Sequence, residues 1–76
     1  MVIITNYSDT YLKINKDESD IFFLAKDGLQ VSARAGSIIL TSSSTSYTYV
    51  FTDIKSPKLT TPDEMVVAIR QYIDNV

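Results

Sequence analysis

The chain has 76 residues, among them seven Lys or Arg and nine Asp or Glu, which gives a formal net charge of −2. It contains neither Cys nor His, so the sequence excludes a disulfide framework and the usual zinc and copper sites. Charges of both signs are interspersed along the chain, which argues against the clustered basic face of a nucleic-acid-binding protein. The length predicts one domain, residues 1–76, whose small core favours association with copies of itself or with a larger partner.

The first residues show no targeting signal. Met1 is followed directly by apolar residues, without the basic segment and the small-residue cleavage site of a secretory signal. The longest apolar run, Ile21 to Ala25, is far shorter than the roughly 20 residues needed to span a bilayer. We therefore expect a protein that is made in the cytoplasm, is not secreted and does not enter a membrane.

Two short apolar runs, residues 2–5 and 10–14, predict a first β-hairpin around a turn at residues 6–9. Pairing across this turn puts Ile3 opposite Leu12.

An acidic segment follows at residues 15–20. Its three carboxylates lack the ligand spacing of an EF-hand loop, so the segment predicts a solvated turn without a metal ion. We expect Asp20 to pair with Arg34 on a neighbouring strand.

Residues 21–51 carry the strongest strand signals. Lys26-Asp27-Gly28 predicts a three-residue hairpin loop in which Gly28 adopts the left-handed conformation, so that Phe23 lies opposite Val31. A two-residue turn at Ala35-Gly36 then puts Ala33 opposite Ile38, Val31 opposite Leu40 and Ser32 opposite Ile39. Because side chains alternate along a strand, one face of the sheet collects the following apolar residues: Ile21, Phe23, Ala25, Leu29, Val31, Ala33, Ile38 and Leu40.

Residues 47–52 alternate aromatic and other side chains and predict a further strand after the hydroxyl-rich loop at residues 42–46. A four-residue loop puts Tyr49 opposite Leu40 and Phe51 opposite Ile38. Aromatic residues at this spacing either pack in a core or form a platform on which nucleic-acid bases stack. The register favours the core.

The clearest local signal is the start of a helix at Thr61-Pro62-Asp63-Glu64. A threonine hydroxyl suits the capping position, proline suits the first helical position, and the glutamate can reach back to the cap. The helix is expected from Pro62 to about Asn75, with Val67 as the one apolar residue outside its apolar stripe: Met65, Val66, Ala68, Ile69, Tyr72, Ile73 and Val76.

The sequence therefore predicts an α+β fold. An antiparallel meander of five or six strands, as an open sheet or a small barrel, is followed by one C-terminal amphipathic helix at about residues 62–75. The helix covers one face of the sheet, and Phe22, Leu24, Ile39 and Val50 make the other face apolar as well. Exposed apolar surface of this kind marks an interface, so we expect these four residues to contact a protein partner. In the alternative arrangement, the first hairpin folds over the sheet as a second layer of a barrel or sandwich.

The aromatic strand, the connector Phe51-Thr52-Asp53-Ile54-Lys55-Ser56-Pro57 and the capped helix resemble a group of small tailed-phage proteins. Those proteins are short β-meanders with a Ser-Pro linker and a terminal amphipathic helix. The resemblance covers residues 20–76 and implies a structural or accessory virion component, such as a capsid, vertex, decoration or connector-associated protein. The meander with its C-terminal helix is also similar to pleckstrin-homology-like domains, although this chain is too short for all their strands and lacks their basic loop.

Together these features favour a non-enzymatic structural or assembly protein of a virion, with other virion proteins or copies of itself as partners. The alternative is a small binding module. It would be either a nucleic-acid-binding sheet that uses Tyr11, Tyr47 and Tyr49 as stacking surfaces, or a PH-like adaptor. The sequence has no acid–base pair, metal cluster, phosphate loop or activated nucleophile that would indicate an enzyme, and we expect no cofactor.

Overall fold

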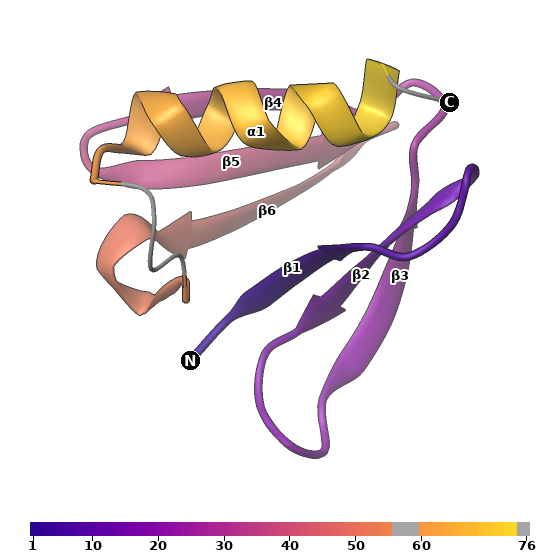
Figure 1. Ribbon diagram of the computed structural model, residues 1–76, viewed down its shortest axis with the longest axis horizontal. Helices are drawn as coiled ribbons and strands as arrows, with labels where there is room; N and C mark the ends of the chain where they lie inside the picture. The colour runs from indigo at the N-terminus through magenta and orange to yellow at the C-terminus, as the bar shows by residue number, and fades with distance from the viewer. Residues whose placement is uncertain (56–59, 75–76) are drawn as a thin grey trace.

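The computed structural model describes residues 1–55 and 60–74. The Ser-Pro of the predicted connector, in residues 56–59, and Val76 of the predicted stripe, in residues 75–76, lie outside the described residues. The predicted α+β class is confirmed (Figure 1), with these elements: β1 (Ile3–Asn6), β2 (Tyr11–Asn15), β3 (Ile21–Ala25), β4 (Gln30–Arg34), β5 (Ser37–Ser42), β6 (Thr45–Val50), the 3-10 helix η1 (Phe51–Asp53) and α1 (Pro62–Asp74).

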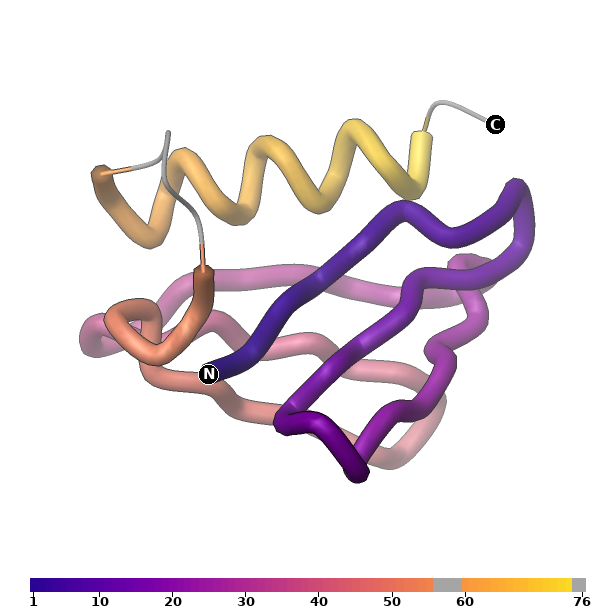
Figure 2. Tube along the Cα trace, turned by 60° about the horizontal axis from the view of Figure 1, so that its bottom comes forward, coloured from indigo at the N-terminus to yellow at the C-terminus, as the bar shows by residue number. Residues whose placement is uncertain are grey.

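The strands form two three-stranded antiparallel meanders, β1-β2-β3 and β4-β5-β6. Figure 2 shows the first sheet in front of the second, with the helix along one side of both. The chain crosses from one sheet to the other just after β3. There the backbone N–H of Leu29 donates to the Lys26 carbonyl at 3.1 Å, and Gly28 has the predicted left-handed conformation, with φ +74°. The turn at residues 26–28 is thus a corner between two sheets.

The predicted hairpin between residues 21–25 and 29–34 is therefore wrong, because β3 pairs with β2. Phe23 lies opposite Lys13 and not opposite Val31. The expected pair between Asp20 and Arg34 is replaced by a contact within one turn, since the carboxylate of Asp20 lies 3.6 Å from the ammonium of Lys16.

A side chain in the acidic segment explains why β2 and β3 form the hairpin. One carboxylate oxygen of Asp17 accepts hydrogen bonds from the backbone N–H groups of Ser19 and Asp20, both at 2.9 Å. This pattern is an Asx-turn, which reverses the chain without glycine. It holds the pKa of Asp17 below its ordinary value, chiefly through the Ser19 backbone hydrogen bond.

The first hairpin forms where the sequence predicts it but in a different register. Ile4 lies opposite Ile14 and Asn6 opposite Leu12, so the predicted pairing of Ile3 with Leu12 is wrong. The turn is longer than predicted because the hydroxyl oxygen of Ser8 accepts a hydrogen bond from the Tyr11 backbone N–H at 3.1 Å. The shift moves Ile3 to the outer face of the sheet.

The second sheet follows the prediction more closely. The register of β4 and β5 is confirmed, with Val31 opposite Leu40 and a tight turn in which Ala35 and Gly36 have φ values of +51° and +78°. The register of β5 and β6 differs from the prediction by two residues, because the serine turn contains two residues and not four. This shift leaves every side chain on its predicted face, and it pairs Ile38 with Tyr49, Leu40 with Tyr47 and Ser42 with Thr45.

Helix α1 begins with the predicted cap. The Thr61 hydroxyl oxygen accepts a hydrogen bond from the Glu64 backbone N–H at 3.3 Å, and the Thr61 hydroxyl lies 3.1 Å from a Glu64 carboxylate oxygen to which it donates. The helix packs on β4 and β5, and Met65, Val66 and Ile69 are buried. Val67 is exposed, as predicted.

One core joins both sheets and the helix. Its buried members come from every layer: Val2, Leu12, Ile14, Leu24, Leu29, Val31, Ile38, Leu40, Tyr49, Ile54, Met65, Val66 and Ile69. The first hairpin, extended by β3, thus lies over the second sheet as a further layer. The alternative raised from the sequence had the hairpin alone fold over a sheet that included residues 21–25.

The N-terminal end of the chain is tied to the segment that follows β6. Val2 and Ile54 form a parallel bridge, in which the Val2 N–H donates to the Asp53 carbonyl at 2.7 Å and the Lys55 N–H donates to the Val2 carbonyl at 2.8 Å. Figure 2 shows the two segments side by side. No local pattern in the sequence predicts this bridge.

Candidate protein interface

The four predicted interface residues do not share a surface. Leu24 is buried, with 4% of its surface exposed, and Phe22 packs against the core with its ring centroid 5.2 Å from that of Tyr47. Ile39 is half-buried and Val50 is 51% exposed on the other sheet. The expected common face is therefore wrong for Phe22 and Leu24, because pairing with β2 turns these two side chains toward the core.

The surroundings of Ile39 and Val50 are polar. Ile39 lies between Ser32 and Thr48 on the neighbouring strands, and Val50 lies opposite Ser37. The outer face of the second sheet therefore offers single apolar side chains among hydroxyl groups, which is ordinary protein surface.

The exposed apolar side chains gather instead on the first sheet. Within residues 1–55 and 60–74, most of the exposed large hydrophobic residues belong to β1, β2, β3 or the segments beside them. We name five of them the aromatic face: Ile3, Tyr7, Tyr11, Ile21 and Phe23. Four of these residues share the outer side of the sheet because they alternate with the buried positions of their strands, and Tyr7 stands in the turn between β1 and β2.

Phe23 is the centre of this face. Its ring centroid lies 4.8 Å from that of Tyr7 and 6.4 Å from that of Tyr11, with interplanar angles of 56° and 75°. Tilted and edge-on arrangements of this kind are favoured between aromatic rings. Even so, Phe23 is 48% exposed, Tyr7 59% and Tyr11 45%. The rings support one another but leave much of their surface uncovered.

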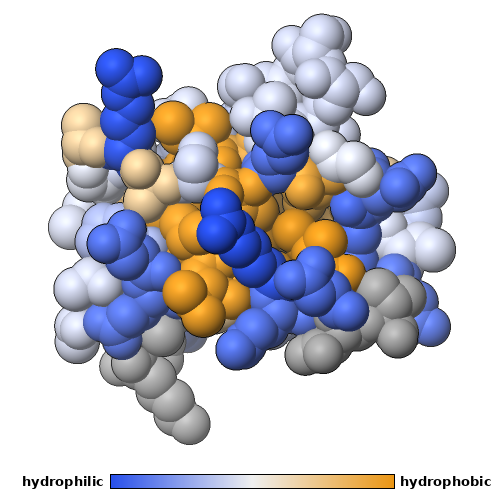
Figure 3. All heavy atoms as spheres, turned by 90° about the horizontal axis from the view of Figure 1, so that it is seen from above, coloured by the Kyte–Doolittle hydropathy of each residue, from blue (hydrophilic) through white to orange (hydrophobic). Residues whose placement is uncertain are grey.

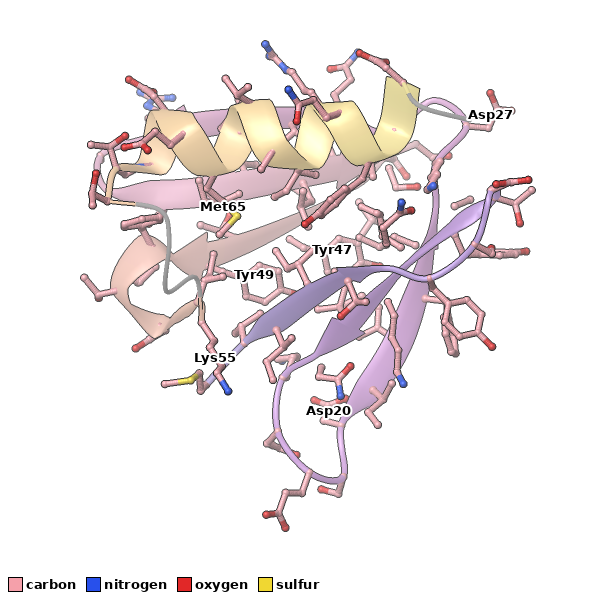
Figure 4. All side chains as sticks on the ribbon, viewed as in Figure 1. Asp20, Asp27, Tyr47, Tyr49, Lys55 and Met65 are labelled. Carbon is pink, nitrogen blue, oxygen red and sulfur yellow. The ribbon has the colours of Figure 1, made fainter. Side chains whose placement is uncertain are left out.

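Few charged groups accompany the rings. Lys13, opposite Phe23 on β2, is the one basic residue within the three strands of the first sheet. Asp20 and Asp27 lie at opposite ends of β3 (Figure 4). The side-chain oxygen of Asn15 is buried and has no hydrogen-bond partner among the described residues. The arrangement is therefore suited to apolar contact and poorly suited to binding a polyanion.

Tyrosines of the second sheet are oriented differently. Tyr49 is buried, and Figure 4 shows Tyr47 and Tyr49 in the space between the helix and the first sheet. Burial raises the pKa of the Tyr49 hydroxyl above its ordinary value of 10.0, and the nearby Tyr47 and Asp20 raise the pKa further. Of the three tyrosines considered for base stacking, only Tyr11 presents an exposed ring.

On the helix side, Val67 is the one exposed large hydrophobic residue within the described part of α1. Seen from this side in Figure 3, a central hydrophobic area is crossed and bordered by hydrophilic side chains. The shallow groove along the outer side of α1 combines Val67 and Ala68 with Asp63, Glu64 and Gln71.

A cavity of about 500 Å³ lies where the β1–β2 turn and the corner after β3 approach the end of α1. Lys26, which is buried, belongs to its lining, and the Lys26 ammonium donates to the side-chain oxygen of Asn6 at 2.6 Å. Asp9 and Asp27 also line this cavity. Among residues 1–55 and 60–74, no three His, Cys, Asp or Glu side chains gather closely enough to hold a metal ion.

No helix in the described part of the chain combines the length and the apolar content needed to cross a bilayer. Comparisons of the chain with protein family models, with curated proteins and with solved structures find no match.

Sequence reasoning missed the aromatic face for one reason. All five residues of β3 are apolar, so alternation within the strand does not decide which side faces the core. The neighbouring strand β2 alternates cleanly, with Leu12 and Ile14 buried. Pairing β3 with β2 through the Asp17 turn would have identified Phe23 as an outward residue.

Proposed function

We propose that this chain is a non-enzymatic structural or assembly protein that acts through protein–protein contacts, as a small component of a tailed-phage virion. The observation that supports contact with a protein is the aromatic face. Contiguous exposed apolar surface is uncommon on monomeric proteins and tends to mark an interaction site. Tyrosine and phenylalanine are enriched in protein interfaces, and Lys13, opposite Phe23, is the one charged residue in the three strands that form this face.

The assignment to a virion is supported by the resemblance of residues 20–76 to small tailed-phage proteins. Of the features that carry this resemblance, the aromatic strand and the capped helix are present in the fold, whereas residues 21–25 belong to the first sheet and not to the meander β4-β5-β6. The partners we propose are other virion proteins or copies of this chain.

A nucleic-acid-binding sheet is the competing function, and one observation favours it: Tyr7, Tyr11 and Phe23 form an exposed cluster of rings on a sheet surface. Single-strand-binding sheets combine such rings with a positively charged groove. Here Lys13 is accompanied by acidic residues at both ends of β3, so the charge favours a protein partner.

The first experiment measures the mass of the native protein in solution by light scattering over a range of concentrations. We expect species above the 8.5 kDa of one chain, and expect Phe23→Asp to shift the protein to monomer. Val67→Glu is the matched control, since Val67 is exposed to a similar extent (55%) but lies on the outer side of α1. A Val67→Glu variant that dissociates as fully as Phe23→Asp would contradict a role for the aromatic face.

The second experiment tests the virion. Phage particles purified from the source by density gradient should contain the chain in a fixed ratio to the major capsid protein, as measured by mass spectrometry. Its absence from such particles would exclude a virion component. Binding to a single-stranded oligonucleotide that weakens with added salt, measured by fluorescence anisotropy, would instead favour the nucleic-acid-binding sheet.

A further inference from the structure

The outer edge of β3 carries a row of unused backbone hydrogen-bonding groups. The Lys26 N–H donates to the Thr10 carbonyl, and the Lys16 N–H donates to the Asp20 carbonyl, both at 2.9 Å. In an antiparallel ladder the residues directed toward the partner strand alternate, so Phe22 and Leu24 bond to β2. Ile21, Phe23 and Ala25 therefore direct their N–H and C=O groups away from β2, and these groups have no hydrogen-bond partner among the described residues.

The other sheet edges are covered, at least in part, or are lined by polar residues. The edge of β4 lies beside α1, and the Arg70 guanidinium donates to the Val31 carbonyl at 2.9 Å. The edge of β1 is occupied at Val2 by the bridge to Ile54. The outward residues of the β6 edge are mostly hydroxyl-bearing: Ser46, Thr48 and Val50.

The edge of β3 has none of these protections. Natural proteins usually blunt a strand edge with Lys, Pro, a bulge or a covering element, because an exposed apolar edge pairs with other chains. Residues 21–25 contain no charged residue, proline or glycine. Ile21 and Phe23, whose backbone groups are free, also have side chains that are 44% and 48% exposed. Both the backbone and the side chains of this edge are therefore available for strand addition.

We propose that the β3 edge pairs with the same edge of a second copy of this chain, antiparallel and around a two-fold axis at Phe23. This inference rests on the proposed function and names its partner. The free backbone groups fall at Ile21, Phe23 and Ala25, symmetrically about Phe23, so each residue finds a matching one in the second copy. Phe23 pairs with Phe23 of the other copy, and Ile21 pairs with Ala25. The two first sheets then form one continuous sheet of six strands.

Charge favours the antiparallel arrangement. Asp20 precedes β3 and Asp27 follows it closely, so a parallel in-register pair would put each acid beside its own copy. Like charges directly opposite one another destabilise a strand pair. In the antiparallel pair, Asp20 of one copy instead lies across from position 26 of the other and Asp27 lies across from Ser19, so no two acids face each other. The low positive charge of the aromatic face also disfavours a nucleic acid as the occupant.

The area of contact predicts a reversible dimer. Edge pairing covers the two strand edges but only part of the exposed surface of Ile21 and Phe23, because their side chains stay on the outer face of the joined sheet. At about 200 Å² for a whole aromatic side chain, the two copies together bury at most about 800 Å². Interfaces of this size belong to weak associations that dissociate on dilution.

A backbone substitution separates edge pairing from other uses of the aromatic face. Ala25→Pro removes an N–H group that points away from β2 and keeps all the aromatic rings, and proline is tolerated on such an edge. We expect this variant to weaken dimerisation about tenfold, since two interchain hydrogen bonds are disturbed. Thr48→Pro makes the same change on the edge of β6 and should leave the dimer intact. Far-UV circular dichroism verifies that both variants are folded.

Disulfide cross-linking tests the register of the two paired β3 strands. The natural chain has no cysteine, so single variants Ile21→Cys and Ala25→Cys report only designed contacts. Opposed residues of a hydrogen-bonded antiparallel pair have Cα atoms about 5.5 Å apart, which suits a disulfide. We expect mild oxidation to cross-link a mixture of the two variants at least tenfold faster than either variant alone. In each variant alone, the two cysteines would be about 13 Å apart along the strands.

The outcomes distinguish this inference from the proposed function. If Phe23→Asp abolishes association while Ala25→Pro dimerises like the natural chain and the mixture gives no excess of cross-link, the edge inference is wrong and the interface of the aromatic face stands. If the natural chain remains monomeric at all concentrations, homodimerisation through β3 is excluded. The presence or absence of the chain in phage particles then decides the proposed function.

Discussion

Ala35 is the residue whose backbone is least suited to its side chain. It stands at φ +51° in the two-residue turn between β4 and β5, followed by Gly36 at φ +78°. A left-handed conformation costs a residue with a Cβ atom roughly 1 kcal/mol, and turns of this kind prefer Asn followed by Gly. The turn therefore forms with only one of its two preferred residues.

We expect Ala35→Asn to raise the free energy of unfolding by about 0.5–1 kcal/mol, because Asn tolerates the left-handed conformation. Urea denaturation followed by circular dichroism measures this change. Gly36→Ala is the converse control and should lower the free energy of unfolding by about 1 kcal/mol. A Cβ atom at Gly36 meets no atom within 4 Å, so that cost comes from the backbone alone. A destabilised Ala35→Asn variant would contradict the turn geometry.

The buried Lys26 gives a second prediction. Its ammonium donates to the Asn6 side chain at 2.6 Å. Asn6→Ala removes that acceptor, and a buried charged donor without its partner costs about 1–3 kcal/mol. Lys26→Met removes the charge together with its need for a partner and should cost less. Thermal unfolding measures which of the two variants is the less stable. A lower stability of Lys26→Met than of Asn6→Ala would show that the ammonium makes favourable contacts beyond Asn6.

Among the elements, α1 depends on the hydroxyl groups at its start. The Glu64 carboxylate accepts hydrogen bonds from the hydroxyls of Thr60 at 2.7 Å and Thr61 at 3.1 Å. These bonds, with that of Thr60 the more important, lower the pKa of Glu64 below its ordinary value of 4.5. The ionised carboxylate is also favoured near the N-terminus of a helix.

The lowered pKa of Glu64 predicts how stability depends on pH. A carboxyl group whose pKa is lower in the folded chain stabilises the fold above its unfolded pKa, and this contribution disappears as the pH falls through the folded pKa. We expect Glu64→Gln to be less stable than the natural chain at pH 7, and the difference between the two variants to shrink as the pH falls below 4.5 and through the lowered pKa of Glu64. Glu18→Gln, in the acidic turn, is the control. A Glu64→Gln deficit that stays constant down to pH 2 would contradict this role.

The elements themselves were largely predictable from sequence, but their pairing was not. Ala35-Gly36 and Thr61 act within a few residues, so the β4–β5 register and the start of α1 follow from local signals. The partner of β3 depends on whether the Asp17 turn or the Gly28 turn makes the hairpin, and both look like hairpin turns in sequence. Because the prediction chose the Gly28 turn, it assigned Phe22 and Leu24 to the interface and Phe23 to the core.

In the whole molecule, one core connects three layers. Leu12 of the first sheet, Leu40 of the second and Ile69 of the helix are each fully buried in the same cluster. A chain of this length has a free energy of unfolding of about 4–11 kcal/mol, so the loss of any one layer removes a large part of it. The layers should therefore unfold together.

We expect Leu12→Ala, Leu40→Ala and Ile69→Ala each to lower the free energy of unfolding by about 2–5 kcal/mol. In every variant, far-UV circular dichroism and tyrosine near-UV signals should report one shared transition. Val67→Ala, at an exposed position of the same helix, should change stability by less than about 0.5 kcal/mol. Separate transitions for helix and sheets would show that the layers fold independently.

The bridge between Val2 and Ile54 has a consequence for the order of folding. Both meanders close through short turns, whereas this bridge joins segments that are distant in sequence, and loop closure costs more entropy as the loop lengthens. The bridge should therefore form after the rate-limiting step. A substitution that weakens this bridge would raise the unfolding rate and leave the refolding rate almost unchanged.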